Sequence, residues 1–265
     1  HASLLDGGLA SGARHQRYAH ADAGDLARRL GACEARRRLV VSDGVFSMDG
    51  DIAPLPDLLA VTRPQQALLM LDEAHALGVL GAEGRGTVSH FGLAPDVVPL
   101  RMGTLGKAFG VYGAFAAGPQ VLIDALQQLA RPAIYTTALP PALAAATRAA
   151  LLLVRADGWR RERLRQHVAR LRAGLLAQGW DLMASVTPIQ PIIIGSAERA
   201  LALSQALAAR GFWVGAIRPP TVPAGTARLR LTLTAAHDEA AIDELLAVLA
   251  DLAPAFVQSV EEEKS

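Results

Sequence analysis

Residues 67–75 read Ala-Leu-Leu-Met-Leu-Asp-Glu-Ala-His, and this stretch decides the fold. Its five leading apolar residues are followed at once by charged ones, a pattern typical of a short buried β-strand. Ligands of open α/β sheets bind beyond the carboxyl ends of the strands. Asp72, at the end of this run, is therefore either a site residue or a helix cap.

Similar apolar runs on both sides predict further strands at residues 38–41, 97–102 and 113–117, with a helix at 55–62. Near-continuous apolar strands between helices favour an α/β domain whose mixed, mostly parallel sheet is covered on both faces. Residues 121–179 have helical spacing, and Pro140-Pro141 fits a helix start. We expect a domain boundary near residue 155, with a large domain at 1–155.

A smaller C-terminal α/β domain is predicted for residues 156–265. Strands are expected at 188–194, 213–217 and 227–234, and helices at 200–210 and 237–252. Residues 261–265 are expected to form a frayed polar tail.

Composition excludes several classes of partner. The chain has 265 residues, of which 51% are hydrophobic and 19% charged, with a formal net charge of +1. This balance gives no electrostatic case for nucleic acid or an anionic membrane. Cys33 is the single cysteine, so a reducing cytoplasmic compartment is the default. Uncharged runs at 132–147 and 182–197 are too short for a membrane span, and the start at His1 lacks leader features, which suggests a soluble fragment.

Lysine is almost absent: Lys107 and Lys264 are the only two among 26 basic residues. Lys107 lies in Thr-Leu-Gly-Lys-Ala-Phe-Gly, residues 104–110. Burial in such apolar surroundings would disfavour the ammonium form, lower the pKa and make the amine a nucleophile able to form a Schiff base. A surface lysine in a turn is the alternative that spacing leaves open.

Together, Asp72 and Lys107 predict a cofactor site. A carboxylate for a pyridinium nitrogen and a later lysine that forms an imine are the essentials of a pyridoxal 5'-phosphate (PLP) site. His75 lies within reach of the same ring, and Thr104 could offer its hydroxyl to the phosphate. A helicase-type NTPase, which Asp-Glu-Ala-His also suggests, is excluded because no Walker-type loop precedes it.

These strings, with Gly84-Arg85-Gly86, resemble the α-oxoamine synthases. The resemblance implies a fold-type-I, aspartate-aminotransferase-like PLP transferase that condenses an amino acid with an acyl thioester. Residues 217–232 resemble the branch that joins L-alanine to a pimeloyl thioester, carried by CoA or a carrier protein, in biotin biosynthesis. The likeness runs from His1 to about residue 252, so the chain is expected to lack the family's N-terminal third.

The resemblance assigns cofactor roles to five residues. Lys107 would hold PLP covalently and later move the substrate's Cα proton. Asp72 would pair with the pyridine nitrogen. His75 and Ser47 would bond the phenolic oxygen, and Thr104 the phosphate.

Other roles implied by the resemblance depend on a second subunit or on the cofactor's outer face. His1 matches a histidine that stacks on the cofactor ring. Thr136 and Thr137 match a segment that reaches the phosphate of the neighbouring subunit. The resemblance therefore implies a homodimer with shared active sites. No metal is expected, because the other histidines lack metal-ligand spacing.

Substrate roles follow from the C-terminal strings. Arg230 would receive the alanine carboxylate as a bidentate partner, with Arg228 the less favoured choice. Thr221 would line the substrate side. Arg218 could touch substrate or only hold a turn.

Two kinds of alternative stay open. Glycine C-acetyltransferases, 5-aminolevulinate synthases and serine palmitoyltransferases share the chemistry and differ in amino acid and acyl chain. A chain without the N-terminal third would expose apolar surface, and such a piece could be inactive and unable to hold PLP.

Overall fold

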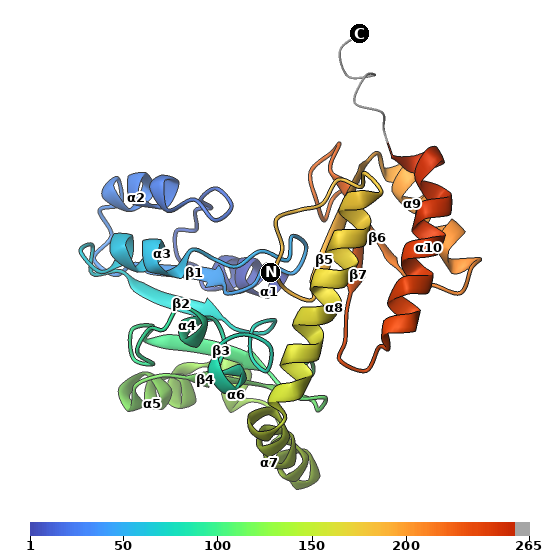
Figure 1. Ribbon diagram of the computed structural model, residues 1–265. Helices are drawn as coiled ribbons and strands as arrows, with labels where there is room; N and C mark the ends of the chain where they lie inside the picture. Colours follow the sequence, from blue (N-terminus) through green and yellow to red (C-terminus); the bar gives the residue numbers. More distant parts are fainter. Residues whose placement is uncertain (258–265) are drawn as a thin grey trace. The chain divides into compact units, whose positions relative to one another are not determined.

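A computed structural model describes residues 1–257, so the predicted polar tail at 261–265 lies outside the described residues. The chain forms two compact units (Figure 1). The N-terminal unit comprises His1–Phe46 and Ile52–Gly158. The C-terminal unit comprises the chain from Trp159 onward together with the short segment Ser47–Asp51.

The N-terminal unit is built on a four-stranded sheet in the order β1-β2-β3-β4. β1 (Leu39–Asp43), β2 (Leu68–Asp72) and β3 (Leu100–Thr104) are parallel, and β4 (Ala114–Ala117) is antiparallel to β3. The mixed, mostly parallel sheet that the apolar runs predict is confirmed.

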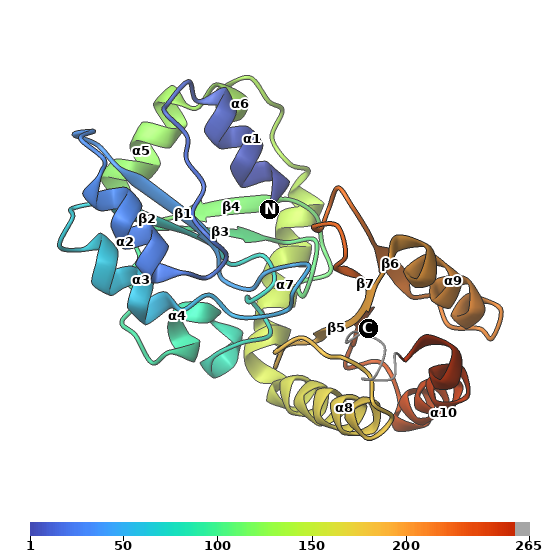
Figure 2. The same cartoon turned by 90° about the horizontal axis from the view of Figure 1, so that it is seen from above.

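One face of this sheet is covered by helices that precede or separate the strands. The covering helices are α2 (Ala23–Gly31), α3 (Leu55–Thr62) and the short α4 (Thr87–His90). Leu26 of α2, Leu58 of α3 and Leu71 of β2 belong to the same core, and each is at most 3% exposed. Figure 2 shows α2 and α3 beside β1 and β2.

The two faces of this sheet are buried to different extents. Burial alternates along β2, where Leu69 and Leu71 are buried and Leu68 and Met70 are only half-buried. No residue is buried in the helices that follow β4, namely α5 (Gln120–Leu129), α6 (Arg131–Ile134) and α7 (Pro141–Ala156). These helices contain only half-buried and exposed residues, so the fully buried core of this unit lies on the face covered by α2, α3 and α4.

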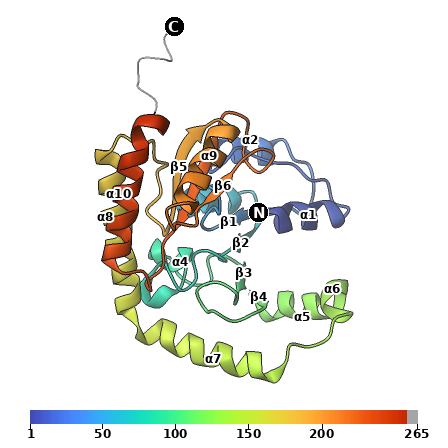
Figure 3. The same cartoon turned by 90° about the vertical axis from the view of Figure 1, so that its right-hand side faces the viewer.

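The C-terminal unit has an antiparallel sheet in the order β5-β7-β6. Its strands are β5 (Ile189–Gly195), β6 (Gly215–Ile217) and β7 (Ala227–Thr232). Its core joins Ile192 and Leu229 to three helices: α8 (Gly158–Ala177), α9 (Ala197–Ala208) and α10 (Glu239–Phe256). Figure 3 shows α8 and α10 side by side, where Arg170 forms ion pairs with Asp243 and Glu239.

Four short helices were not predicted from the sequence patterns. These are α1 (Ala2–Ala10), α2, the 3₁₀ turn η1 (Ala82–Gly84) and α4. The other predicted helices and strands are present with ends shifted by a few residues. Within residues 1–257, no helix combines the length and apolar character that a membrane crossing requires.

Candidate active site

The carboxyl ends of the three parallel strands bring the predicted cofactor residues to one edge of the N-terminal unit. Asp72 lies beside Asp43 of β1 and Met102 of β3 in the strand register. The chain continues from β2 into His75 and from β3 through Thr104 into Lys107. The sheet therefore places a carboxylate, an imidazole, a hydroxyl and an amine at adjoining strand ends, where α/β sheets bind ligands.

Asp72 is a buried carboxylate with few partners. It is 3% exposed, and its Oδ1 accepts a hydrogen bond of 2.9 Å from the Ala74 amide. Burial raises its pKa above the usual carboxyl range, and the negative charge of Asp43 adds to the rise. The positive charge of Lys107 opposes it, which shows that the two groups interact. A cation bound here would relieve the cost of burying this charge.

Glu73, the next residue, points away from this edge into the packing beneath it. It is 1% exposed, and its carboxylate accepts hydrogen bonds from the amides of Thr87 (2.8 Å) and Val88 (3.5 Å) at the start of α4. A side chain at Gly86 would collide with that carboxylate, and Gly86 has a φ of +91°. Glu73 thus ties the end of β2 to the Gly84–Gly86 turn.

Lys107 lies in a glycine-flanked turn after β3, and its side chain is exposed. Of the two alternatives that the sequence leaves open, a buried amine or a lysine in a surface turn, the described structure has the second. A side chain added at Gly106 would meet nothing closer than 3.8 Å, and one at Gly110 would meet nothing within 4 Å. The turn therefore leaves open space in which a flat ring can approach the backbone and the amine.

Three other predicted cofactor residues lie at or near this edge. The Thr104 hydroxyl donates to the Gly113 carbonyl (3.2 Å) and accepts from the Gly106 amide (3.3 Å), so it shapes the turn that carries Lys107. His75 is half-buried in the turn after Glu73. His1 caps α1 through its ring nitrogen, and its amine contacts Asp43 at 2.9 Å.

The two candidate carboxylate-binding arginines have different partners in the C-terminal unit. Arg228 is 4% exposed and pairs with Asp49 at 2.5 Å, so its charge is already neutralised inside the unit. Arg230 is half-buried, and its Nε donates to the Ser47 carbonyl at 2.6 Å. Within the described residues it forms no ion pair, and burial lowers its pKa. Of these two arginines, Arg230 is the one whose guanidinium keeps an edge without an ion pair in the described residues.

The remaining predicted residues lie on exposed turns. Thr136 and Thr137 follow α6, and both are exposed. Thr221 and Arg218 flank the cis Pro219–Pro220 peptide bond, and the Thr221 amide donates to the Arg218 carbonyl at 3.0 Å.

Sequence reasoning missed two carboxylates of this region. Asp43 ends β1 as Asp72 ends β2, and the same strand-end argument applied to residues 39–43 would have found it. Glu73 was considered only as part of the Asp-Glu-Ala-His string. Its contacts lie at the start of α4, a helix too short to be detected by periodicity.

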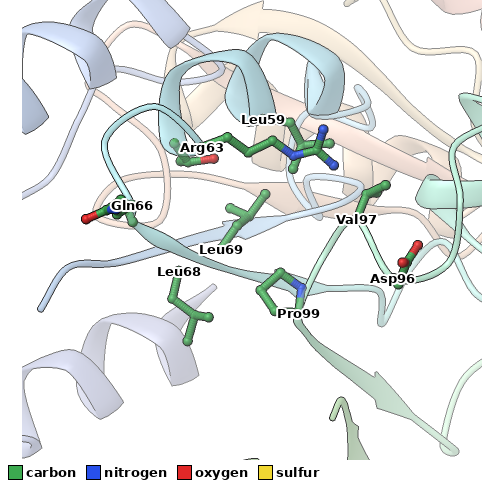
Figure 4. Close-up of a pocket in the computed structure, with 10 residues that line it drawn as sticks. Leu59, Arg63, Gln66, Leu68, Leu69, Asp96, Val97 and Pro99 are labelled. Carbon is green, nitrogen blue, oxygen red and sulfur yellow. The ribbon is translucent and has the colours of Figure 1, made fainter.

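A pocket of about 370 Å³ lies at the opposite edge of the same sheet (Figure 4). Leu68 and Leu69 begin β2 there, and Pro99 directly precedes β3. Its charged residues, Arg63 and Asp96, are exposed. This pocket is at the amino ends of the strands, away from the cofactor residues.

Known proteins resemble the whole described chain. An 8-amino-7-oxononanoate synthase from Methylococcus capsulatus is 61% identical over 254 residues, covering 96% of this chain and 66% of the relative. The enzyme of the same name from Cellvibrio japonicus is 56% identical, covering 95% and 63%. The chain thus spans slightly less than two thirds of the length of these relatives.

Solved structures share the fold. A serine palmitoyltransferase from S. paucimobilis with a bound PLP–myriocin aldimine matches with a TM-score of 0.92 at 34% identity, covering 96% of this chain and 65% of that chain. An 8-amino-7-oxononanoate synthase from Francisella tularensis matches with a TM-score of 0.83 at 30% identity, covering 96% and 73%. The family model for aminotransferases of class I and II matches residues 1–249. The chain belongs to the class I and II aminotransferase family.

Proposed function

We propose that this chain is the larger part of a PLP-dependent 8-amino-7-oxononanoate synthase, which condenses L-alanine with a pimeloyl thioester in biotin biosynthesis. The observation that carries the proposal is the position of buried Asp72 at the end of β2, with the positive charge of Lys107, in the turn after the neighbouring β3, close enough to lower its pKa. The relatives of that name, at 56–61% identity, support the same activity.

The residues present fit the cofactor. PLP needs a carboxylate for its ring nitrogen and an amine for its aldehyde, and Asp72 and Lys107 supply these groups. The pKa of Asp72, raised by burial, favours a cationic partner such as a protonated pyridine. Open space beside Gly106 and Gly110 leaves room for the ring.

When bound, PLP supplies the electron sink that stabilises negative charge at the substrate's Cα. In the proposed reaction, Lys107 Nζ holds the cofactor, gives way to the amine of alanine and then moves the Cα proton. Asp72 keeps the proton on the ring nitrogen. The products are the amino ketone, the free thiol carrier and CO₂.

We propose that residues 1–155 hold the cofactor and that residues 156–265 bind the substrate carboxylate. Arg230 would orient alanine through its free guanidinium edge, since Nε is already bonded to the Ser47 carbonyl. Ser47 and His75 would bond the phenolic oxygen, Thr104 the phosphate, and His1 would stack on the ring. Thr221 and Arg218 would line the substrate side.

We also propose a cytoplasmic homodimer with shared sites. Exposed apolar side chains on the helices after β4 support a partner there, including Val121 (73% exposed), Leu129 (76%) and Leu152 (66%). Figure 3 shows α5, α6 and α7 following β4. Thr136 and Thr137 lie on the exposed loop between α6 and α7, where a second subunit could use them. Sedimentation velocity over a range of concentrations tests this.

Borohydride reduction of the cofactor-loaded protein, followed by peptide mapping, tests the site. We expect the label on Lys107, and a label elsewhere would overturn the assignment. Absorbance spectra should show a visible cofactor band that shifts when L-alanine is added. A chain that takes up no PLP would instead support the inactive-fragment alternative.

Other members of the family remain the second candidates. The match at 34% identity to a serine palmitoyltransferase is consistent with shared chemistry and favours that substrate less than the matches at 56–61% identity favour alanine. Measuring thiol release with alanine, glycine and serine against several acyl-CoAs separates these activities.

A further inference from the structure

Residues 47–51, Ser-Met-Asp-Gly-Asp, belong to the C-terminal unit although their neighbours on both sides belong to the N-terminal unit. The chain enters and leaves this segment through Val45 and Ile52, which form an antiparallel bridge with each other. The segment is therefore a short excursion of the chain, and several of its hydrogen bonds join it to residues more than a hundred positions away.

Arg228 forms the first attachment of the segment. Its Nη1 donates to Asp49 Oδ1 at 2.5 Å and to the Met48 carbonyl at 3.4 Å, and its Nε donates to the Thr226 carbonyl at 3.1 Å. Arg228 is 4% exposed, so the ion pair with Asp49 is shielded from solvent on the arginine side. Such charge-assisted hydrogen bonds are stronger than neutral ones.

Two hydroxyls form the second attachment. Ser185 Oγ and Thr187 Oγ1 each donate to the Gly50 carbonyl at 2.8 Å, and both residues are at most 1% exposed. Gly50 has a φ of +73°, and a side chain there would collide with the Ile189 carbonyl. Only glycine suits this close approach without strain.

Arg230 completes the arrangement from the same face of β7. Residues two apart on a strand project to the same side of the sheet, so Arg228 and Arg230 face the segment together. Arg230 Nε donates to the Ser47 carbonyl at 2.6 Å, which fixes one edge of its guanidinium and leaves the other without an ion pair.

We propose that Asp49, Arg228, Ser185 and Thr187 are positioning residues that lock residues 47–51 onto the C-terminal unit, so that Ser47 and the carboxylate-binding edge of Arg230 are held as one rigid platform. The proposal rests on the proposed function for the role of Arg230. It predicts that loosening Asp49 weakens alanine binding, although Asp49 itself touches no substrate.

The first experiment needs neither cofactor nor activity. Endoproteinase Asp-N cuts before aspartate, so it reports access to the Met48–Asp49 and Gly50–Asp51 bonds in the cofactor-free protein. We expect Arg228→Gln to speed both cleavages by about tenfold, the scale of one lost charge-assisted hydrogen bond. Arg170→Gln is the matched control, because Arg170 pairs with Asp243 and Glu239 in the same unit. Equal cleavage rates in the two variants would overturn the proposal.

Global destabilisation by Arg228→Gln would speed cleavage at every aspartate. The variant Asp49→Asn distinguishes local loosening from global destabilisation, because it keeps the shape of the side chain and leaves the Gly50–Asp51 bond to be cut. In this variant too, native-rate cleavage of that bond contradicts the proposal.

The second experiment measures Kd for L-alanine from the spectral shift of the cofactor-loaded protein. We expect Asp49→Asn to weaken binding by about tenfold and Asp243→Asn, its control, by less than about twofold. An unchanged Kd in Asp49→Asn would overturn the link to Arg230. If the unaltered protein binds PLP but not L-alanine, the proposed function fails, and the cleavage rates still decide whether the segment is locked.

Discussion

Removing the Glu73 carboxylate should destabilise the N-terminal unit and change how its stability depends on pH. Glu73 is 1% exposed and accepts hydrogen bonds from the amides of Thr87 and Val88. Glu73→Ala leaves the Thr87 amide buried and unpaired, at about 1–3 kcal/mol. The emptied volume adds about 1 kcal/mol. We therefore expect a loss of about 2–4 kcal/mol in the free energy of unfolding.

Glu73→Gln should cost much less, about 1 kcal/mol or below, because the amide oxygen can still accept from the Thr87 amide. Glu83→Gln is the matched control, since Glu83 is an exposed glutamate that pairs with Arg85 and Arg155. That exposed pair should contribute within about 0.5 kcal/mol. Urea unfolding followed by far-UV circular dichroism measures the free energy of unfolding of the unaltered protein and of these three variants.

The dependence of folding stability on pH is a second test of the role of Glu73. Burial raises the pKa of Glu73 above its usual value of 4.5. The folded state then holds this proton more tightly than the unfolded state, so stability falls as the pH rises from the unfolded pKa through the folded one. Glu73→Gln has no such proton and should flatten the slope from about pH 4.5 upward.

Two results would refute this reasoning. Equal losses of stability in the Gln and Ala variants would show that the hydrogen bond to Thr87 contributes nothing. An unchanged pH slope in Glu73→Gln would show that the carboxyl titrates alike in both states. Because Asp72 also has a pKa raised by burial, the slope should flatten without disappearing.

Asp72→Asn should lower turnover by about a hundredfold or more in cofactor-loaded protein, since an amide cannot stabilise a protonated ring nitrogen as a carboxylate does; the absorbance band checks that cofactor is still bound. Arg230→Lys should raise KM for L-alanine by about tenfold with a smaller change in kcat, because lysine cannot form the bidentate contact. Gly86→Ala should lower the free energy of unfolding by more than about 1 kcal/mol, because φ is +91° and the added carbon meets Glu73. Gly12→Ala has a φ of +70° and open space around it, so it measures the cost of the left-handed backbone conformation without a collision.

Placement at the ends of strands could be predicted from local sequence. Asp72 ends an apolar run, Lys107 lies in the turn that follows another, and parallel strands bring such ends to one edge. The exposure of Lys107 could not be predicted in the same way. An apolar neighbourhood in sequence becomes burial only when another element packs over it, and α5, α6 and α7 bury no residue of their own.

The choice between Arg228 and Arg230 also could not be made from the sequence pattern. Both alternate on β7 in the same way, so strand periodicity cannot separate them. The difference comes from Asp49, which neutralises Arg228 from a distant part of the chain. Long-range pairing of this kind leaves no local signal in a single sequence.

The buried and half-buried charges of this protein therefore differ in whether they have a partner in their own unit. Arg228 has a carboxylate partner and Glu73 has backbone partners, so their charges serve the fold. Asp72 and Arg230 are partly desolvated by burial, yet within residues 1–257 neither forms an ion pair. Charges held in this state gain most from a ligand of opposite charge. Under the proposed function, a protonated ring at Asp72 and a carboxylate at Arg230 would be such ligands.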